Sequence, residues 1–297
     1  MATISVSSTY AGEALRGYIL AAILGGETLS TNGISVESNI PFKRVIKKLG
    51  VGAIVQAGSC DFSPTSGVTI SEAVLEPQKI KINEEICFED IENTWDDNSA
   101  NIAADLQTAL TDAYVGAMAK KVEEMIWQSN LATTGTTTLN LFDGFEAILS
   151  GSTQGVTGTT LTTSNIVAEI NKVYAALPSA VAKKPKGELV IFLSHKAYTL
   201  YEMALAAQGI NTTSGVNVFN NIYGIELKPV SGLSNDNIIV MGEKANFYVG
   251  TNLNSDFNEI KIIDMRETTG DDSVRFILKG KLDVAVAYPL EVVFYKP

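Results

Sequence analysis

Ser194 and His195 are the residues of this sequence whose types and position come closest to covalent chemistry. They follow the apolar run Leu189–Leu193, where a buried strand is expected to give way to a helix. The nucleophilic serine of many hydrolases sits at such a junction, but within a G-x-S-x-G pattern whose glycines are absent here. We therefore interpret Ser194 as the cap of a helix and His195, the single histidine of the chain, as part of its first turn. A soluble acidic hydrolase that uses both residues stays as an alternative hypothesis.

The other polar clusters lack the spacing of known sites. Asn252, Asn254 and Asp256 resemble the start of a calcium loop, but Phe257 stands where that loop needs glycine and Ile263 where it needs glutamate. The 24 glycines include neither a phosphate-binding loop with its lysine nor a dinucleotide-binding fingerprint. The sequence therefore predicts no catalytic residue, no cofactor and no bound metal, and a protein that is not an enzyme.

The composition indicates a folded, acidic protein. The chain has 297 residues, of which 45% are hydrophobic, and a formal net charge of −11. This charge argues against a basic surface that grips nucleic acid, although an acidic wall could still enclose nucleic acid without sticking to it. The length corresponds to about two domains.

Neither a disulfide scaffold nor a membrane anchor is predicted. Cys60 and Cys87 are the only cysteines, and they could pair at the base of the loop that they flank or stay free. The longest early apolar run, Tyr18–Leu24, is far shorter than the roughly 20 residues that a membrane-spanning helix needs. No clear small-residue cleavage site follows this run. We therefore expect a soluble protein made in the cytoplasm.

A long helix over residues 98–130 is predicted to organise the chain. The stretch has no proline and a single glycine, Gly116, and at roughly 1.5 Å per residue it would form a rod of about 45 Å. One apolar stripe comprises Ile102, Leu106, Ala109, Leu110, Ala113 and Ala117, a second comprises Tyr114, Met118, Val122 and Met125, and Asp105, Asp112 and Glu123 form a narrow polar line. A rod buried on two sides needs broad sheets or neighbouring subunits as its cover.

Two strand-like runs, Val68–Leu75 and Gln78–Ile91, precede this helix and are separated at Pro77. We expect them to form a long two-stranded excursion. In the second run Ile80, Ile82, Ile86 and Phe88 fall on one face, and Lys79, Lys81 and Glu85 fall on the other. Because a lone hairpin is marginal in water, the excursion implies a partner surface.

The first 45 residues are predicted to form an arm. Ser, Thr and Gly are frequent around one helical piece, Tyr10–Leu24, and such a segment usually becomes ordered by lying on something else. A short strand, Val51–Ala57, is expected soon after it. Lys43, Arg44, Lys47 and Lys48 form the only dense basic cluster. This cluster is either a solvated helix face or a patch attracted to the acidic surface of a neighbouring copy.

Strands and helices are mixed after the long helix. A helix capped by Thr163 or Ser164 is expected to reach Leu177, and a second helix is expected over residues 194–208. The predicted strands are Leu189–Leu193, Tyr223–Val230, Asn237–Met241 and Phe247–Val249. This mixture indicates an α+β fold instead of regular βαβ units.

The chain closes with a long hairpin. Asn258–Arg266 and Ser273–Tyr288 are predicted strands on either side of the turn Glu267–Asp272. In the second strand, Phe276, Leu278, Leu282, Val284 and Val286 alternate with Arg275, Lys279, Lys281 and Asp283. This period of two predicts one buried face and one solvent face, and a cover for the long helix.

This order of elements resembles the major capsid proteins of tailed bacteriophages, the Hong Kong-97-like fold family. The best segments are IYGIELKPVSGLSNDNIIVMGEKANFYVGTNL from Ile222 and EIKIIDMRETTGDDSVRFILKGKLDVAVAYPLEVVFYK from Glu259, with EICFEDIENTW from Glu85 leading into the long helix. The resemblance covers nearly the whole chain and is architectural.

The resemblance implies a division of the chain. Residues 1–45 would be an N-terminal arm and 60–91 an extended loop. Residues 46–59, 92–145 and 258–282 would form a peripheral domain with a spine helix at about 99–130. Residues 146–257 and 283–297 would form an axial domain.

The resemblance also implies subunit contacts. We expect contact residues among Lys79 and Lys81 on the extended loop and Arg266, Asp271 and Arg275 on the long hairpin, whose ETTGDD turn would meet other capsomers. Some family members cross-link a loop lysine to an asparagine of the last hairpin. The strand Ser273–Tyr288 contains no asparagine, so cross-linking is not expected.

The implied function is that of a structural shell protein. Many copies, as pentamers and hexamers, would assemble in the host bacterial cytoplasm into an icosahedral virion capsid around double-stranded DNA, without sequence-specific DNA binding. A portal would be a partner, and a scaffold or cement protein a further one. An encapsulin-type nanocompartment with protein cargo is the alternative. A tail-tube or decoration protein would not need so long a helix.

Overall fold

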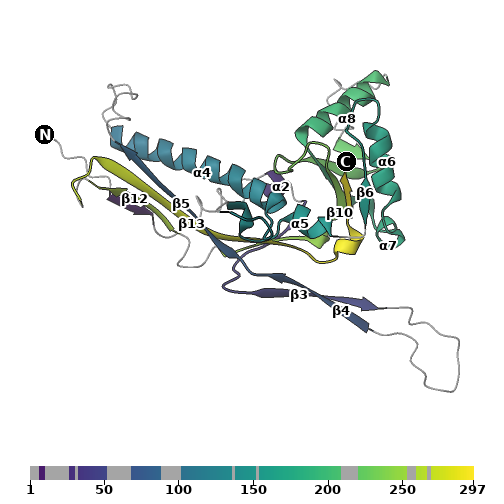
Figure 1. Cartoon of the computed structure of the whole chain (residues 1–297), viewed down its shortest axis with the longest axis horizontal. Helices are drawn as coiled ribbons and strands as arrows, with labels where there is room; N and C mark the ends of the chain where they lie inside the picture. Colours follow the sequence, from purple (N-terminus) through teal and green to yellow (C-terminus); the bar gives the residue numbers. More distant parts are fainter. Residues whose placement is uncertain are drawn as a thin grey trace, which may run out of the picture.

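The protein is described by a computed structural model, over residues 7–10, 27–30, 33–51, 68–87, 102–135, 138–151, 154–208, 220–252, 259–265 and 269–297. Its shape is elongated (Figure 1). A long helix, α4 (Ile102–Gln128), lies beside a sheet of long strands in one half, and a second sheet with several helices forms the other half. A hairpin of β3 (Arg44–Val51) and β4 (Val68–Leu75) projects from the middle.

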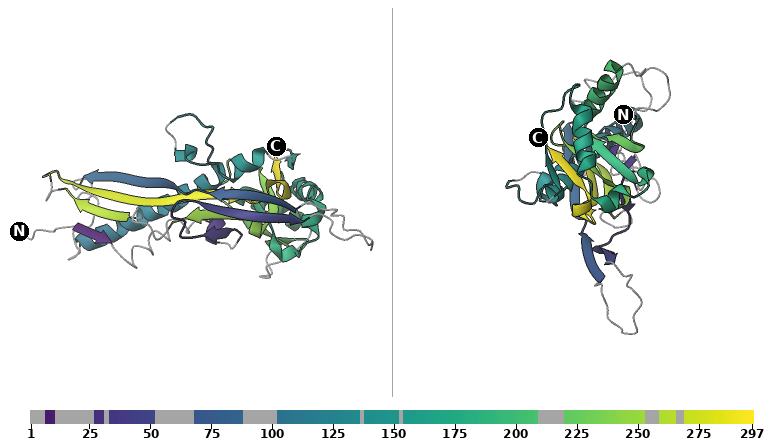
Figure 2. Two further views of the ribbon diagram at one scale, coloured as in Figure 1. Left: turned by 90° about the horizontal axis from the view of Figure 1, so that it is seen from below. Right: turned by 90° about the vertical axis from the view of Figure 1, so that its right-hand side faces the viewer.

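The first sheet has the order β1-β12-β13-β11-β2, with β5 also paired to β13. Its strands are β1 (Ser7–Tyr10), β2 (Ser35–Glu37), β5 (Gln78–Cys87), β11 (Phe247–Thr251), β12 (Glu259–Asp264) and β13 (Ser273–Val286). The first half of β13 runs between β12 and β5, and its last residues pair with β11. Figure 2 shows these long strands side by side along the molecule. β13 is therefore the strand on which the sheet is assembled.

The second sheet has the order β6-β14-β10-β7-β9-β8. Its strands are β6 (Gly155–Thr157), β7 (Leu189–Leu193), β8 (Asn221–Ile222), β9 (Ile225–Pro229), β10 (Ile239–Glu243) and β14 (Val293–Lys296). Helices α6 (Ile166–Ala175), α7 (Ser179–Ala182) and α8 (His195–Ala207) accompany it. The apolar run at β7 is central because all five of its residues are buried.

Two hydrophobic clusters hold these parts together. The larger cluster joins α4, β13 and the short helix α5 (Phe145–Ser150) to one face of the second sheet. Trp127 packs edge-on against Phe145 and Phe192, with ring centroids 5.3 Å apart in both pairs. The smaller cluster lies between the other face of that sheet and helices α6 and α8. The two faces of β7 therefore belong to different clusters. Burial on both faces explains why its sequence is continuously apolar.

The predicted long helix is confirmed as α4, and its side chains are described from residue 113 onward. Met118, Val122 and Met125 of the second stripe are buried, whereas Ala113 and Ala117 of the first stripe are exposed. Glu123, predicted on a polar line, is buried because Thr28 covers it. Over the described side chains, α4 is therefore covered along one side.

The two strands before α4 exist, but the predicted pairing between them is wrong. β4 pairs with β3, and β5 leaves the hairpin to pair with β13 along ten residues. The basic cluster of residues 43–48 lies on and next to β3, so its interpretation as a helix face is also wrong. Val51 ends β3, and the rest of the strand predicted at 51–57 lies outside the described residues.

The remaining elements agree with the sequence to within a few residues. The predicted helix of residues 194–208 is α8, and the closing hairpin is β12 with β13. The N-cap of α6 is Asn165, instead of Thr163 or Ser164. The helical piece predicted at 10–24 lies outside the described residues.

Candidate functional site

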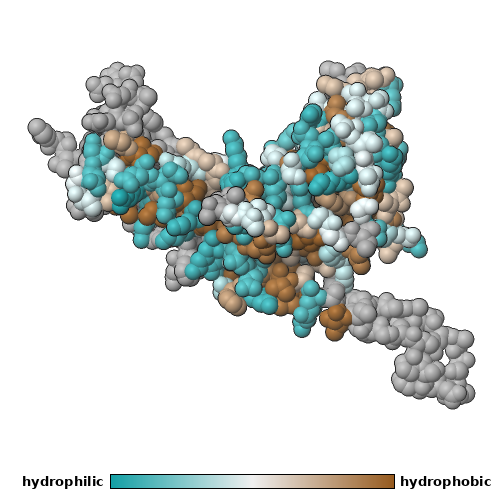
Figure 3. All heavy atoms as spheres, in the orientation of Figure 1, coloured by the Kyte–Doolittle hydropathy of each residue, from teal (hydrophilic) through white to brown (hydrophobic). Residues whose placement is uncertain are grey.

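One face of the β3–β4 hairpin exposes apolar side chains on both sides of an ion pair between Lys47 and Glu72. Val45 lies directly opposite Val74, and the two side chains are 39% and 40% exposed. Ile70, on the same face because strand side chains alternate, is 63% exposed. Phe42, just before β3, is 74% exposed. Figure 3 shows apolar atoms at the surface where the hairpin leaves the body, and the right-hand view of Figure 2 shows the hairpin standing away from it.

The strands of the hairpin are held together by few interactions besides their own pairing. β3 and β4 form a sheet of their own with two strands. The ion pair between Lys47 and Glu72 is exposed, with 3.5 Å between Nζ and Oε1, and such pairs contribute little. An isolated two-stranded sheet is at best marginally stable in water. The exposed face therefore marks a surface that another protein surface would cover.

The root of the hairpin, in contrast, is firmly held. Ile40, Leu75 and Ala285 form a small buried cluster of their own. The Ile40 amide donates to the Thr251 carbonyl at 3.1 Å. On β13, Lys281 and Asp283 are only 7% and 8% exposed, so the predicted solvent face of β13 is wrong at these two positions, since the hairpin root covers them.

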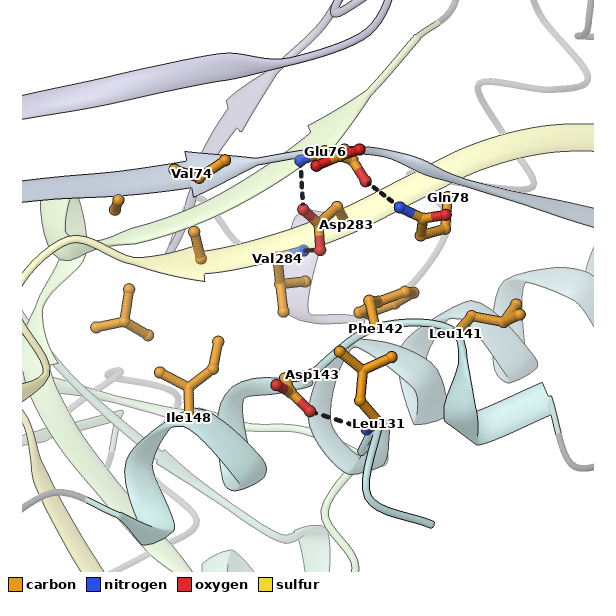
Figure 4. A pocket seen from close by; sticks show the side chains of 13 residues that line it. Val74, Glu76, Gln78, Leu131, Leu141, Phe142, Asp143, Ile148, Asp283 and Val284 are labelled. Carbon is orange, nitrogen blue, oxygen red and sulfur yellow. Dashed lines mark hydrogen bonds between the residues drawn. The ribbon is translucent and has the colours of Figure 1, made fainter. Parts of the chain in front are cut away.

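Asp283 makes its hydrogen bonds with the backbone. Its Oδ2 accepts from the Glu76 amide at 2.6 Å, and its Oδ1 accepts from its neighbour Val284 at 2.8 Å (Figure 4). Burial is the largest influence and raises the pKa of this carboxyl to about 6, while the two backbone hydrogen bonds lower it and the nearby carboxylates of Glu76 and Asp143 raise it. The ionised form of Asp283 is therefore less favourable in the folded chain than in water.

A groove of about 550 Å³ opens beside this root. Its lining combines apolar side chains from β4, β13 and the segment around α5 with the polar residues Glu76, Gln78, Asp143 and Asp283. The Asp143 carboxylate accepts from the Leu131 amide at 2.8 Å (Figure 4). The groove holds no arrangement of a nucleophile with a base.

A second groove, of about 590 Å³, separates α4 from β5. Its floor includes Tyr114, which stacks on Phe276 with ring centroids 4.5 Å apart. Lys79 and Lys81, both predicted contact residues, lie on its rim and are exposed. These two lysines therefore border an open, largely apolar surface.

Two other predicted contact residues, Asp271 and Arg275, lie at the far end of β13. Arg275 donates from Nε to the Glu85 carboxylate of the same chain at 3.1 Å. Asp271 is exposed in the turn before β13, next to Gly270, whose φ of +80° suits glycine. Arg266 lies outside the described residues. The structure thus brings Arg275 to β5 and leaves Asp271 at a tip.

Buried polar residues that the sequence analysis missed hold the segment α2 (Glu27–Ser30). The Thr28 amide donates to Glu123 at 3.1 Å, and the Thr28 hydroxyl also donates to this carboxylate. Trp127 Nε1 donates to the Thr28 hydroxyl at 2.8 Å. Burial raises the pKa of Glu123, against the lowering effect of these hydrogen bonds. No pattern in the sequence links residue 28 to residue 123.

Ser194 and His195 are engaged in structural contacts. The Ser194 hydroxyl accepts from the Ala197 amide at 3.0 Å, which confirms it as the helix cap, and donates to the Asp236 carbonyl at 2.9 Å. His195 Nε2 lies 2.8 Å from a carboxylate oxygen of Glu27. The two side chains therefore have separate partners.

The described ranges contain no group of three or more side chains that could hold a metal ion. Among the helices of these ranges, none is long and apolar enough to cross a membrane. Cys87 is an exposed free thiol; Cys60 and the calcium-like residues Asn254 and Asp256 lie outside the described residues.

Comparison with solved structures gives matches over almost the whole chain. A chain in the procapsid of satellite phage P4, whose structure includes the size determination protein Sid, has a TM-score of 0.62 at 11% identity, covering 98% of this chain and 93% of that chain. A chain of Mycobacterium phage Adephagia has a TM-score of 0.59 at 14% identity, covering 97% and 94%.

A third matching structure is a chain of a virus-like particle from Pyrococcus furiosus, with a TM-score of 0.54 at 12% identity, covering 95% of this chain and 98% of that chain. No protein-family model matches the sequence, and a search of curated proteins finds no match. The chain therefore has the fold found in these phage and virus-like shells, which confirms the predicted α+β capsid-type fold.

The raised pKa of Asp283 predicts how stability depends on pH. Between the ordinary value of 3.8 and about 6, the folded chain binds this proton more tightly than the unfolded chain. The contribution of this group to the free energy of unfolding is therefore largest at low pH and falls as pH rises through that window. Relative to Asp283→Asn, the natural chain should gain about 2 kcal/mol between pH 7 and pH 4.

Urea unfolding of both chains, unassembled, at several pH values measures this difference. Asp283→Asn is the matched control because it keeps the shape of the side chain and one acceptor, while every other titrating group is common to both. Parallel pH profiles of the free energy of unfolding for the two chains would contradict the raised pKa of Asp283.

Proposed function

We propose that this chain is the major capsid protein of a tailed bacteriophage, which self-assembles into an icosahedral shell around double-stranded DNA. The observation that carries this proposal is the projecting hairpin, which is held at its root and exposes Val45, Ile70 and Val74. An exposed apolar strand pair is a liability in a monomer. It is useful where every copy meets an identical neighbour in a closed symmetric assembly. The fold shared with phage and virus-like shells supports the proposal.

The proposed parts follow the capsid fold. Residues 1–45 are the arm and 60–91 the extended loop. Residues 46–59, 92–145 and 258–282 form the peripheral domain, and 146–257 with 283–297 the axial domain. β4 and β5 fall within the extended loop as bounded here, whereas β3, the other strand of the projecting hairpin, precedes its first residue. In this arrangement the arm and the hairpin lie over adjacent copies, so each copy contributes to several modest interfaces.

The proposed partners are further copies in pentamers and hexamers, a portal, and a scaffold or cement protein. The net charge of −11 suits a wall that encloses DNA without adhering to it. The protein is synthesised and assembled in the host bacterial cytoplasm and ends in the virion capsid. It acts by geometry and is not an enzyme, in keeping with the structural contacts made by Ser194 and His195.

An encapsulin-type nanocompartment is the second candidate. Its support is the similarity to a virus-like particle from Pyrococcus furiosus, a shell that is not described as that of a phage. The two candidates differ in what the particles contain. Nucleic acid in particles isolated from the native source supports the virus, and a protein cargo supports the nanocompartment.

Assembly is expected to require the apolar face of the hairpin. Ile70→Lys combined with Val74→Lys places two charges on this face, and burying an unpaired charge in an interface is strongly unfavourable. We expect shells to be replaced by free subunits or capsomers, measured by sizing chromatography and negative-stain electron microscopy. Met203→Lys is the matched control, because Met203 is a similarly exposed residue on α8. Shells that form equally well with the doubly charged hairpin would contradict this role.

Arg275 provides a separate test of the proposed rim contacts, which also include Lys79, Lys81, Arg266 and Asp271. Arg275→Glu reverses one charge and also breaks the pair with Glu85. Glu85→Gln removes the charge that faces Arg275 and keeps an acceptor for the Ser273 hydroxyl, so it is the control for loss of the pair within the chain. We expect Arg275→Glu to slow assembly at low salt, followed by light scattering, with a smaller effect at high salt. Equal rates for both variants would limit Arg275 to its contact within the chain.

A further inference from the structure

Two residues of β13 hold the two ends of the projecting hairpin. At the upstream end, Lys281 Nζ donates to the Pro41 carbonyl at 3.3 Å. At the downstream end, the Glu76 amide donates to the Asp283 carboxylate at 2.6 Å (Figure 4). The two side chains are two positions apart on one strand, so they project from the same face. One short stretch of β13 thus contacts the chain both where it enters the hairpin and where it leaves.

Burial of these two charges has to be explained. Removing a lysine and an aspartate from water is costly unless strong hydrogen bonds compensate. An apolar pair would hold the root by burial alone, as Ile40, Leu75 and Ala285 already do beside it. Apolar contacts are non-directional, whereas hydrogen bonds depend on the angle between donor and acceptor. The two charged residues therefore add a fixed direction to the attachment.

The connections next to these contacts are stiff. Asn39, with φ of 67°, lies in the left-handed region two residues before Pro41, and the φ of Pro41 itself is restricted by its ring. On the other side, Pro77 follows Glu76 directly. The Ile40 amide is bonded to Thr251 of β11. These residues restrict the backbone on the body side of both contacts. On the hairpin side, Glu76 directly follows Leu75, the last residue of β4, and two residues separate Pro41 from β3.

We propose that Lys281 and Asp283 are positioning residues that set the angle at which the projecting hairpin leaves the body of the subunit. The angle itself is a property of the single chain. Its consequence rests on the proposed function: in a shell, this angle decides where the hairpin meets the neighbouring copy, and hence the curvature that repeated contacts produce.

The angle can be followed by electron–electron distance measurements between spin labels at Ile70→Cys on β4 and Met203→Cys on α8, with Cys60 and Cys87 replaced by serine. Both label positions are exposed. The labelled chain is diluted into unlabelled chain so that distances within one subunit are recorded. We expect one narrow distance distribution with Lys281 and Asp283 present. With Lys281→Met and Asp283→Leu together, we expect it to become about twofold broader or more, as for a released segment.

Three further variants make the test specific. Lys279→Met alters the preceding residue on the same face of β13 and should leave the distribution narrow. Lys281→Arg keeps a donor for the Pro41 carbonyl and should also leave it narrow. If the double variant does not fold, Asp283→Leu alone decides, through hydrogen exchange at the Glu76 amide, which should be faster than in the natural chain while β7 amides stay protected.

An unchanged distribution in the folded double variant, or unchanged exchange at Glu76 in Asp283→Leu, overturns the proposal. Electron microscopy of the same samples tests the proposed function separately. Broadening in the double variant supports the positioning role even if the natural chain forms no shells, an outcome that would count against the capsid assignment. A narrow distance distribution in the double variant, together with uniform shells, overturns the positioning role and supports the capsid assignment.

Discussion

β13 has to bury both of its faces over residues 280–286, and the rest of the structure depends on this constraint. Leu282, Val284 and Val286 enter the large cluster shared with α4 and α5, while Lys281, Asp283 and Ala285 lie beneath the hairpin root. Farther along, the same strand is flanked by β12 and β5. One continuous strand thus connects the long helix, the second sheet and the projecting hairpin. A disturbance near residue 283 would be felt in all three, because a packed interior transmits small displacements.

The subunit has well-buried clusters at its centre and leaves several surfaces uncovered at its edges. The clusters around Trp127 and around β7 are fully buried. The hairpin face, the rim of the groove between α4 and β5, and the turn at Asp271 are open to solvent. These open regions lie far apart on an elongated body (Figure 1). Several separated contact regions suit a subunit with many neighbours better than a dimer with a single interface.

The sequence predicted those elements that follow from local periodicity. α4, β7 and β13 carry their patterns over many residues, and each was found within a few residues of its predicted bounds. Pairing was harder: β4 and β5 are adjacent in sequence, but β4 finds a better partner in β3, and Pro77 allows the chain to change sheets there. The site was least predictable. Lys281 and Asp283 occupy positions that a period of two assigns to solvent, and only the return of residues 40–43 and 75–76 over β13 buries them.

A three-dimensional reconstruction of the particles formed by the natural chain, by electron cryomicroscopy, would test the central claim most directly. The account predicts closed icosahedral shells in which Val45, Ile70 and Val74 of each hairpin are covered by a neighbouring copy. The hairpin would leave the body at one angle, with the contacts of Lys281 and Asp283 intact. Shells in which this face stays in solvent, or a chain that forms only a compact monomer with its hairpin protected from protease, would contradict the account.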